Sequence, residues 1–195
     1  MTRSQLVLGD IADLRAYETE RSGFRSRIIE LKRLRRIPVG DFVTLLFENR
    51  ETVRFQVQEM ARAERMLRDD QIQIELDTYN ALIPQPGELV ATMFIELTSK
   101  TELERWLPRL VGIEESVLLE GHGTAIRATV DPEHAGQLSR SDITASVHYV
   151  KFLIPESFRA DFSSGGWSLA LDHPEYQATT ALSAEFCASI ASDWA

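Results

Sequence analysis

Three glutamates and His148 fall where the residue pattern predicts positions that point into the protein, and His173 falls at a strand end, where functional groups often collect. Glu48 ends an apolar run, Glu64 interrupts the apolar stripe of a predicted helix, and Glu96 lies on the second face of a predicted buried strand. His148 shares a strand face with apolar residues, and His173 stands at a strand end beside an aspartate. A buried charge is costly unless it is paired or bound to a metal, and carboxylates with imidazoles hold non-haem metals. These five residues are therefore the candidate metal ligands.

The same carboxylates allow a second interpretation, a buried network of arginine–carboxylate pairs that organises the fold without catalysing a reaction. The segment FENRETVRFQVQEMARAER (47–65) supplies the cations, because Arg54, Gln58 and Arg65 form a polar stripe beside its apolar one. One sequence cannot show whether these groups converge, so the network and the metal site both stay open.

A third interpretation is a binding site for a small anion. Arg50, Arg54 and Arg62 supply positive charge from one segment. With Gln58 and Tyr79 they are the candidate ligand-binding residues. Strands that are apolar on both faces favour a fold that could enclose such a pocket.

The segment 47–65 is predicted to be a helix, although VRFQVQ (53–58) alternates like a strand. Over a longer window its stripe has helical spacing, with members Val53, Val57, Met60, Glu64 and Leu67. Asn49 is a suitable N-cap for this helix.

No sequence motif fixes a reaction. The chain lacks the phosphate-binding loop GxxxxGK[ST], the GxSxG elbow, HExxH and the Glu-x-x-His pair of di-iron bundles. GHGTAI (121–126) lacks the third glycine of a dinucleotide-binding turn. The single cysteine, Cys187, excludes an intrachain disulfide and a cysteine-cluster metal site, and it is predicted to be buried. No nucleotide cofactor is expected, and a non-haem metal is the cofactor that the candidate residues suggest.

The composition indicates a soluble acidic protein. The chain has 195 residues, 44% of them hydrophobic, and a formal net charge of −9. Nucleic-acid binding needs a broad basic surface, so it is not expected, and neither is adhesion to anionic membranes. No apolar run approaches the length of a membrane span, so a cytoplasmic protein is expected. The acidic surface suits a protein partner, and a homo-oligomer is compatible with it.

The predicted fold is α+β and a single domain, residues 1–195. Residues 1–86 form its helix-rich part, and residues 87–195 form a strand-rich part with a mainly antiparallel, barrel-like sheet. Helices are expected over residues 10–35, 49–67, 70–83 and 99–107, from Asp131, and from Ser183 onward; strands are expected over 42–47, 89–97 and 143–154, with hairpins over 117–130 and 167–182. IPVGD (37–41) is predicted to be a turn.

Several blocks together resemble an uncharacterised bacterial family, domain-of-unknown-function family 3501. They include LGDIADLRAYETER (8–21), FENRETVRFQVQEMARAER (47–65), ELDTYNALIP (75–84), FIELT (94–98), WLPRLVGIE (106–114), VHYVKF (147–152) and LALDHPEYQ (169–177). The resemblance covers nearly the whole chain and implies no catalytic residues. It associates the chain with gene neighbourhoods of rubrerythrin-like and iron–sulfur proteins, and hence with peroxide or iron redox metabolism.

The first functional hypothesis is therefore an accessory or binding protein of such a redox system. The alternatives are a metal-dependent enzyme or iron-handling protein with a Glu/His site, and a small-anion binder.

Overall fold

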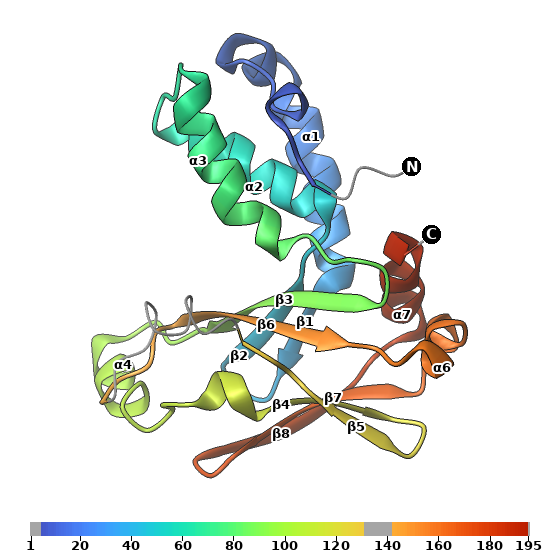
Figure 1. The fold of residues 1–195 in the computed structure, drawn as a ribbon. Coiled ribbons are helices and arrows are strands. Elements are labelled where there is room, and N and C mark those ends of the chain that lie inside the picture. The colour runs from blue at the N-terminus through green and yellow to red at the C-terminus, as the bar shows by residue number, and fades with distance from the viewer. Residues whose placement is uncertain (1–4, 131–141, 195) are drawn as a thin grey trace.

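Eight strands form two antiparallel sheets in residues 5–130 and 142–194, the residues that the computed structural model describes (Figure 1). Sheet A has the strand order β1-β2-β3-β6, and sheet B has the order β5-β4-β7-β8. The strands are β1 (Arg36–Val39), β2 (Val43–Phe47), β3 (Glu88–Ile95), β4 (Val117–Gly121), β5 (Thr124–Arg127), β6 (Val147–Leu153), β7 (Trp167–His173) and β8 (Tyr176–Ala181). The predicted α+β class is confirmed.

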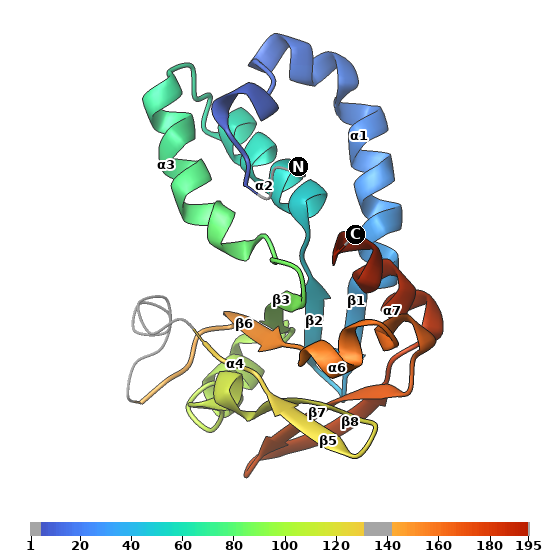
Figure 2. The same ribbon diagram turned by 45° about the vertical axis from the view of Figure 1, so that its right-hand side comes forward.

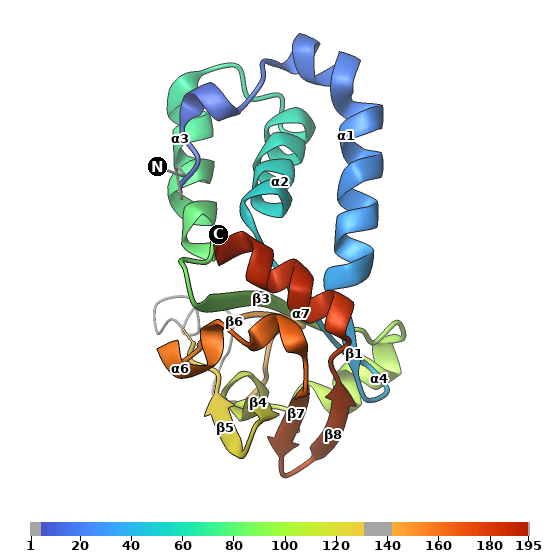
Figure 3. The same cartoon turned by 90° about the vertical axis from the view of Figure 1, so that its right-hand side faces the viewer.

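Helices α1, α2 and α3 stand together on one side of sheet A, and sheet B lies on its other side (Figures 1 and 3). The helices are α1 (Leu14–Arg35), α2 (Arg50–Ala63), α3 (Asp69–Tyr79), α4 (Lys100–Trp106), α6 (Glu156–Arg159) and α7 (Ala184–Ala191). Short 3-10 turns are η1 (Leu8–Asp10), η2 (Asn80–Leu82), η3 (Ile113–Ser116), η4 (Phe162–Ser164) and η5 (Ser192–Trp194). Sheet A is therefore the middle layer of the molecule.

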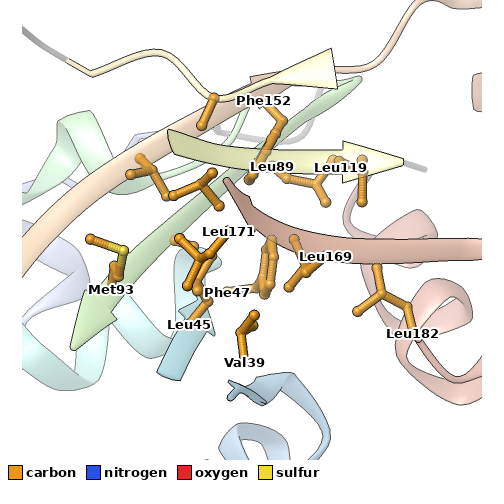
Figure 4. Packing of buried hydrophobic residues seen from close by; sticks show 14 of the residues in the cluster. Val39, Leu45, Phe47, Leu89, Met93, Leu119, Phe152, Leu169, Leu171 and Leu182 are labelled. Carbon is orange, nitrogen blue, oxygen red and sulfur yellow. The ribbon is translucent and has the colours of Figure 1, made fainter. Parts of the chain in front are cut away.

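Alternation along the strands of sheet A gives each of its faces a different neighbour. In β6, His148, Val150 and Phe152 are buried, whereas Val147 and Tyr149, which alternate with them, are half-buried. The first set faces sheet B, in a core that also contains Phe47 and Leu169 (Figure 4). Residues of the second set face the helices, so the helix-side face of sheet A can carry polar groups without disturbing the core between the sheets.

Helix α2 forms over Arg50–Ala63, within the segment where the spacing predicts a helix, and it ends before the predicted limit at residue 67. The side chain of Asn49 caps it by accepting hydrogen bonds from the backbone of Glu51 and Thr52. Val53 and Val57 are buried in the cluster beneath the helices. The strand-like alternation of this segment is therefore overruled by its helical stripe.

Two features of the predicted fold are wrong. The strands do not close into a barrel, since they form two separate sheets. Residues 36–39 form strand β1, whereas the prediction made 37–41 a turn. Pro38 favoured the turn prediction, because proline cannot donate a hydrogen bond to a strand ladder. It is tolerated here because β1 lies at the edge of sheet A. The turn itself begins at Gly40.

Other predicted elements are confirmed, including the hairpin 117–130, the pair of strands in 167–182 and the helix capped by Ser183. The strand predicted over 143–154 is shorter and begins at Val147. The helix predicted from Asp131 lies outside the described residues. Within residues 5–130 and 142–194, no helix combines the length and apolar character needed to cross a membrane.

The end of α1 lies beside the C-terminal helix α7 (Figure 2), and Arg35 joins the two. Its side chain is only 1% exposed, and its Nη1 lies 2.7 Å from Oδ2 of Asp193. Its Nη2 also donates to the carbonyl of Ser189 at 2.6 Å. A buried guanidinium is tolerated when its charge and its donors are matched in this way. The basic end of α1 thus contributes a structural ion pair.

Replacing Arg35 with alanine is expected to lower the free energy of unfolding by about 3–5 kcal/mol, because it leaves the partners of a buried ion pair unmatched. Urea denaturation measures this change. Arg33→Ala is the matched control on the same helix, since the Arg33 side chain is 70% exposed. The control is expected to change the free energy by less than about 0.5 kcal/mol, and equal losses in the two variants would contradict the assignment.

Candidate functional site

A cavity of about 220 Å³ lies between the helices and the helix-side face of sheet A. Its sheet side is formed by Leu46, Glu48, Thr92, Phe94, Val147 and Tyr149, and its helix side by Lys32, Thr52, Val53, Gln56, Tyr79 and Leu82. These residues come from helices α1 to α3, turn η2 and strands β2, β3 and β6, together with Glu48 just after β2. The cavity is therefore a product of the tertiary packing.

The Glu48 carboxylate is held at the wall of this cavity by two threonines. Thr52 donates to its Oε2 at 2.5 Å, and Thr92 donates to its Oε1 at 2.7 Å. Thr52 lies in the first turn of α2, four residues after Glu48, and Thr92 lies on the neighbouring strand β3. Glu48 is 8% exposed. Both oxygens are thus engaged by hydroxyl groups, which fix the orientation of the side chain.

Tyrosine side chains form another part of the wall. Burial raises the pKa of the Tyr149 phenol, and neighbouring Tyr79 and the Glu48 carboxylate raise it further. Tyr149 is therefore a neutral phenol at physiological pH. A neutral phenol can donate or accept a hydrogen bond, so the cavity presents a hydroxyl close to a carboxylate.

The cavity combines apolar walls with a few convergent polar groups, which is typical of a small-molecule site. Its volume is below the roughly 300–1,000 Å³ of pockets that hold drug-sized ligands. Lys32, whose side chain carries an ammonium group, and Gln56 line the helix side of the cavity, whereas Glu48 lines its sheet side. The arrangement can bind a small polar molecule by hydrogen bonds and charge.

The five candidate metal ligands are not brought together. Glu48 lies in the cavity, whereas His148 lies on the opposite face of sheet A, in the core. Glu96 is exposed and pairs with Arg36. Among the described residues, no three His, Cys, Asp or Glu side chains are grouped so that they could hold a metal ion.

Both candidate histidines are buried and hydrogen-bonded. His148 Nε2 lies 2.9 Å from Thr144 Oγ1 and from the carbonyl of Ala145, and its Nδ1 is 3.9 Å from Glu114. Burial lowers the pKa of His148, which favours the neutral ring. His173 Nε2 lies 3.2 Å from the Val111 carbonyl. Both rings therefore form hydrogen bonds with polar groups inside the protein.

The prediction that Glu64 interrupts a buried stripe is wrong. Helix α2 ends at Ala63, and Glu64 is its exposed C-cap residue. Arg65 follows with a φ of 52°, a left-handed conformation that turns the chain out of the helix. The prediction extended the apolar stripe of α2 beyond Ala63, where the helix ends.

Glu59, which the sequence reasoning missed, is the paired carboxylate of α2. It accepts hydrogen bonds from the Tyr17 hydroxyl at 2.7 Å and from Arg21 Nε at 2.8 Å, and Arg21 Nη2 lies 2.8 Å from its second oxygen. The Arg21 hydrogen bond, with the Tyr17 hydroxyl and despite partial burial, lowers the pKa of Glu59 to about 2. Tyr17 and Arg21 are four positions apart in the helix predicted over residues 10–35, so they lie on the same helix face. This spacing was the available signal.

Most candidate ligand-binding residues belong to this helical network. Arg50 pairs with Asp10 at 2.8 Å, Arg54 Nε donates to the Asp10 carbonyl at 3.0 Å, and Arg62 pairs with Glu18. Gln58 is fully buried and bonds to both backbone groups of Ala12 at 2.9 Å. Only the fifth, Tyr79, lines the cavity. The polar side chains of α2 therefore bind the segment before α1, at Asp10 and Ala12, and the first turns of α1, at Glu18.

Five polar cavity residues were not predicted: Lys32, Thr52, Gln56, Thr92 and Tyr149. Thr92 carried a usable signal, because it is a polar residue between Val90 and Phe94 on the second face of a strand predicted to be buried. For Lys32, Gln56 and Tyr149, the pattern around each residue is that of an ordinary amphipathic element.

The fold and cavity define an α+β protein in which three helices cover one sheet of a two-sheet stack and enclose a small polar pocket. The chain belongs to the protein family of unknown function DUF3501, which it matches over residues 5–194. A crystal structure at 1.90 Å of a novel protein of unknown function from Burkholderia pseudomallei K96243 is similar to it. The two chains are 32% identical with a TM-score of 0.89, over 98% of this chain and 100% of the other. A search of curated proteins found no relative.

Replacing Glu59 with glutamine is expected to lower the free energy of unfolding near neutral pH, because it removes the charge that Arg21 and Tyr17 bind. The folded-state pKa of Glu59, about 2, lies below its ordinary value of 4.5. Its stabilisation is therefore complete above about pH 4.5 and is lost as the pH falls toward about 2. Urea denaturation over this pH range is expected to show the gap between wild type and variant narrowing until it closes.

Glu64→Gln is the control from the same segment, because its side chain is exposed at the end of α2. Near neutral pH it is expected to change the free energy of unfolding by less than about 0.5 kcal/mol. A larger loss for Glu64→Gln than for Glu59→Gln would reverse the assignment.

Proposed function

We propose that this protein is a binding protein that holds a small polar molecule in the cavity between its helices and sheet A. The observation that carries the proposal is the convergence of a buried carboxylate, a lysine and two tyrosines on one cavity of about 220 Å³. Buried polar groups normally form hydrogen bonds with other groups of the protein. A cavity on which several of them converge is therefore the first place to expect a ligand.

The construction of the cavity supports a preformed site. Thr52 and Thr92 fix the Glu48 side chain from two different elements, so its position does not depend on a ligand. Binding sites that are fixed before the ligand arrives lose less conformational entropy on binding. The geometry therefore favours a binding role in which the protein changes shape little.

The alternative functions receive less support. The candidate metal ligands are separated, and Arg50, Arg54 and Arg62, the candidate anion-binding arginines, lie close to Asp10, Glu20 and Glu18. An accessory role in peroxide- or iron-related redox metabolism rests on the family resemblance alone, and no arrangement of the described residues adds to it. A protein partner likewise stays a prediction.

A variant that fills the cavity tests the proposal. Val147 lines the cavity from β6, and Val147→Phe is expected to abolish ligand binding by occupying the space. The measurement is ligand-detected NMR with a panel of amino acids, diamines, dicarboxylates, sugars and sugar phosphates, followed by thermal denaturation with any binder. At a ligand concentration about 100-fold above Kd, a stabilisation of about 2.7 kcal/mol is expected, which raises the Tm of a chain this size by roughly 5–10 °C.

Leu153→Phe is the matched control, since Leu153 is on the same strand but is 60% exposed. It is expected to bind as the wild type does. The proposal would be overturned if no class of compound binds the wild-type protein, or if a binder is retained unchanged by a folded Val147→Phe variant.

A further inference from the structure

The Glu48 carboxylate is more than nine-tenths buried and borders the cavity. Its hydrogen-bond donors, Thr52 and Thr92, are neutral hydroxyls, which orient a carboxylate but leave its charge in place. No ion pair among the described residues includes Glu48, in contrast to Glu59 and Glu96, which each pair with an arginine. A buried carboxylate of this kind is matched best by a cation brought from outside.

The neighbouring walls suit an ammonium group. Tyr79 and Tyr149 border the same cavity, and aromatic rings attract cations through their faces. The Tyr149 phenol can also accept a hydrogen bond from an ammonium group. Carboxylate and tyrosines together therefore provide charge, acceptors and aromatic surface within one small space.

Lys32 adds a group of the opposite charge. It lines the cavity from α1, and its Nζ lies over the ring of Phe55, 5.7 Å from the ring centre. Among the ion pairs of the described residues, none joins Lys32 to Glu48. The wall thus holds one carboxylate and one ammonium group that do not neutralise each other directly. A ligand with both charges complements both.

Resting on the proposed function, we infer that the occupant of the cavity is a small zwitterion of the amino-acid type, with its ammonium group at Glu48 and its carboxylate toward Lys32. The volume limits the ligand to a small metabolite. Dicarboxylates and sugar phosphates are disfavoured, because they would place a negative charge against Glu48.

Pairs of compounds that differ in one group test the inference on the wild-type protein. The probes are L-alanine with L-lactate, L-valine with 2-hydroxy-3-methylbutanoate, and 5-aminopentanoate with 5-hydroxypentanoate and pentylamine. At least one amino acid is expected to bind about tenfold or more tightly than its hydroxy acid, because only the ammonium group pairs with the buried charge. Titrations followed by NMR give each Kd.

Two variants locate the groups. Glu48→Gln keeps the shape of the side chain but removes its charge, and it is expected to weaken the best amino acid about tenfold or more. Lys32→Met is expected to remove the preference for 5-aminopentanoate over pentylamine. Glu185→Gln is the control, because Glu185 is exposed in the first turn of α7.

Equal binding of amino acid and hydroxy acid by the wild-type protein would overturn the inference, whether or not Glu48→Gln folds. Equal binding of 5-aminopentanoate and pentylamine would also overturn it, in favour of a simple organic cation. Binding of a dicarboxylate, sugar or sugar phosphate in place of every amino acid would refute the zwitterion and leave the proposed function standing. Binding by no compound of either panel would refute both.

Discussion

Sheet A is buried on both faces, and this constraint decides where the polar groups of the chain lie. Strands covered on both sides cannot direct polar side chains to water, so such groups need partners inside the protein. On the helix-side face, Thr44 donates to Glu96 and Thr92 donates to Glu48, and each glutamate directly follows a strand. Arg36 supplies a cation to Glu96. Glu48 instead borders a cavity and forms no ion pair among the described residues, and this difference makes it the chemically distinctive group of the fold.

Helical spacing and strand alternation were sufficient to predict most elements of the fold, including α2 and the burial of Glu48. They failed at the point where an element ends. The choice of Glu64 assumed that the stripe of α2 continued, whereas the helix stops at Ala63 and Arg65 adopts a left-handed conformation. The paired carboxylate is Glu59, and identifying it requires knowing that α1 packs on α2 so that Tyr17 and Arg21 reach it.

The cavity was the harder prediction for a related reason. Its walls come from elements distant in the sequence, so Lys32, Thr92 and Tyr149 have no common local pattern. Adjacent residues of β6 also lie on opposite faces of sheet A, since His148 faces the core between the sheets and Tyr149 borders the cavity. Successive residues of a strand point to opposite faces, but only the packing of both layers shows which face contains a space. The sequence thus predicted one charged residue of the site and not the site itself.

The ion pair of Arg35 has a consequence for the order in which the chain folds. Arg35 and its partner Ser189 are separated by 154 positions, and Trp194 donates a hydrogen bond to the carbonyl of Glu88. Contacts over such separations close late, because the entropy of a long loop is lost before the contact stabilises it. Until α7 docks, the end of α1 carries a guanidinium without its native partners. The native contacts at the end of α1 are therefore complete only when α7 and the turn that follows it have docked against it.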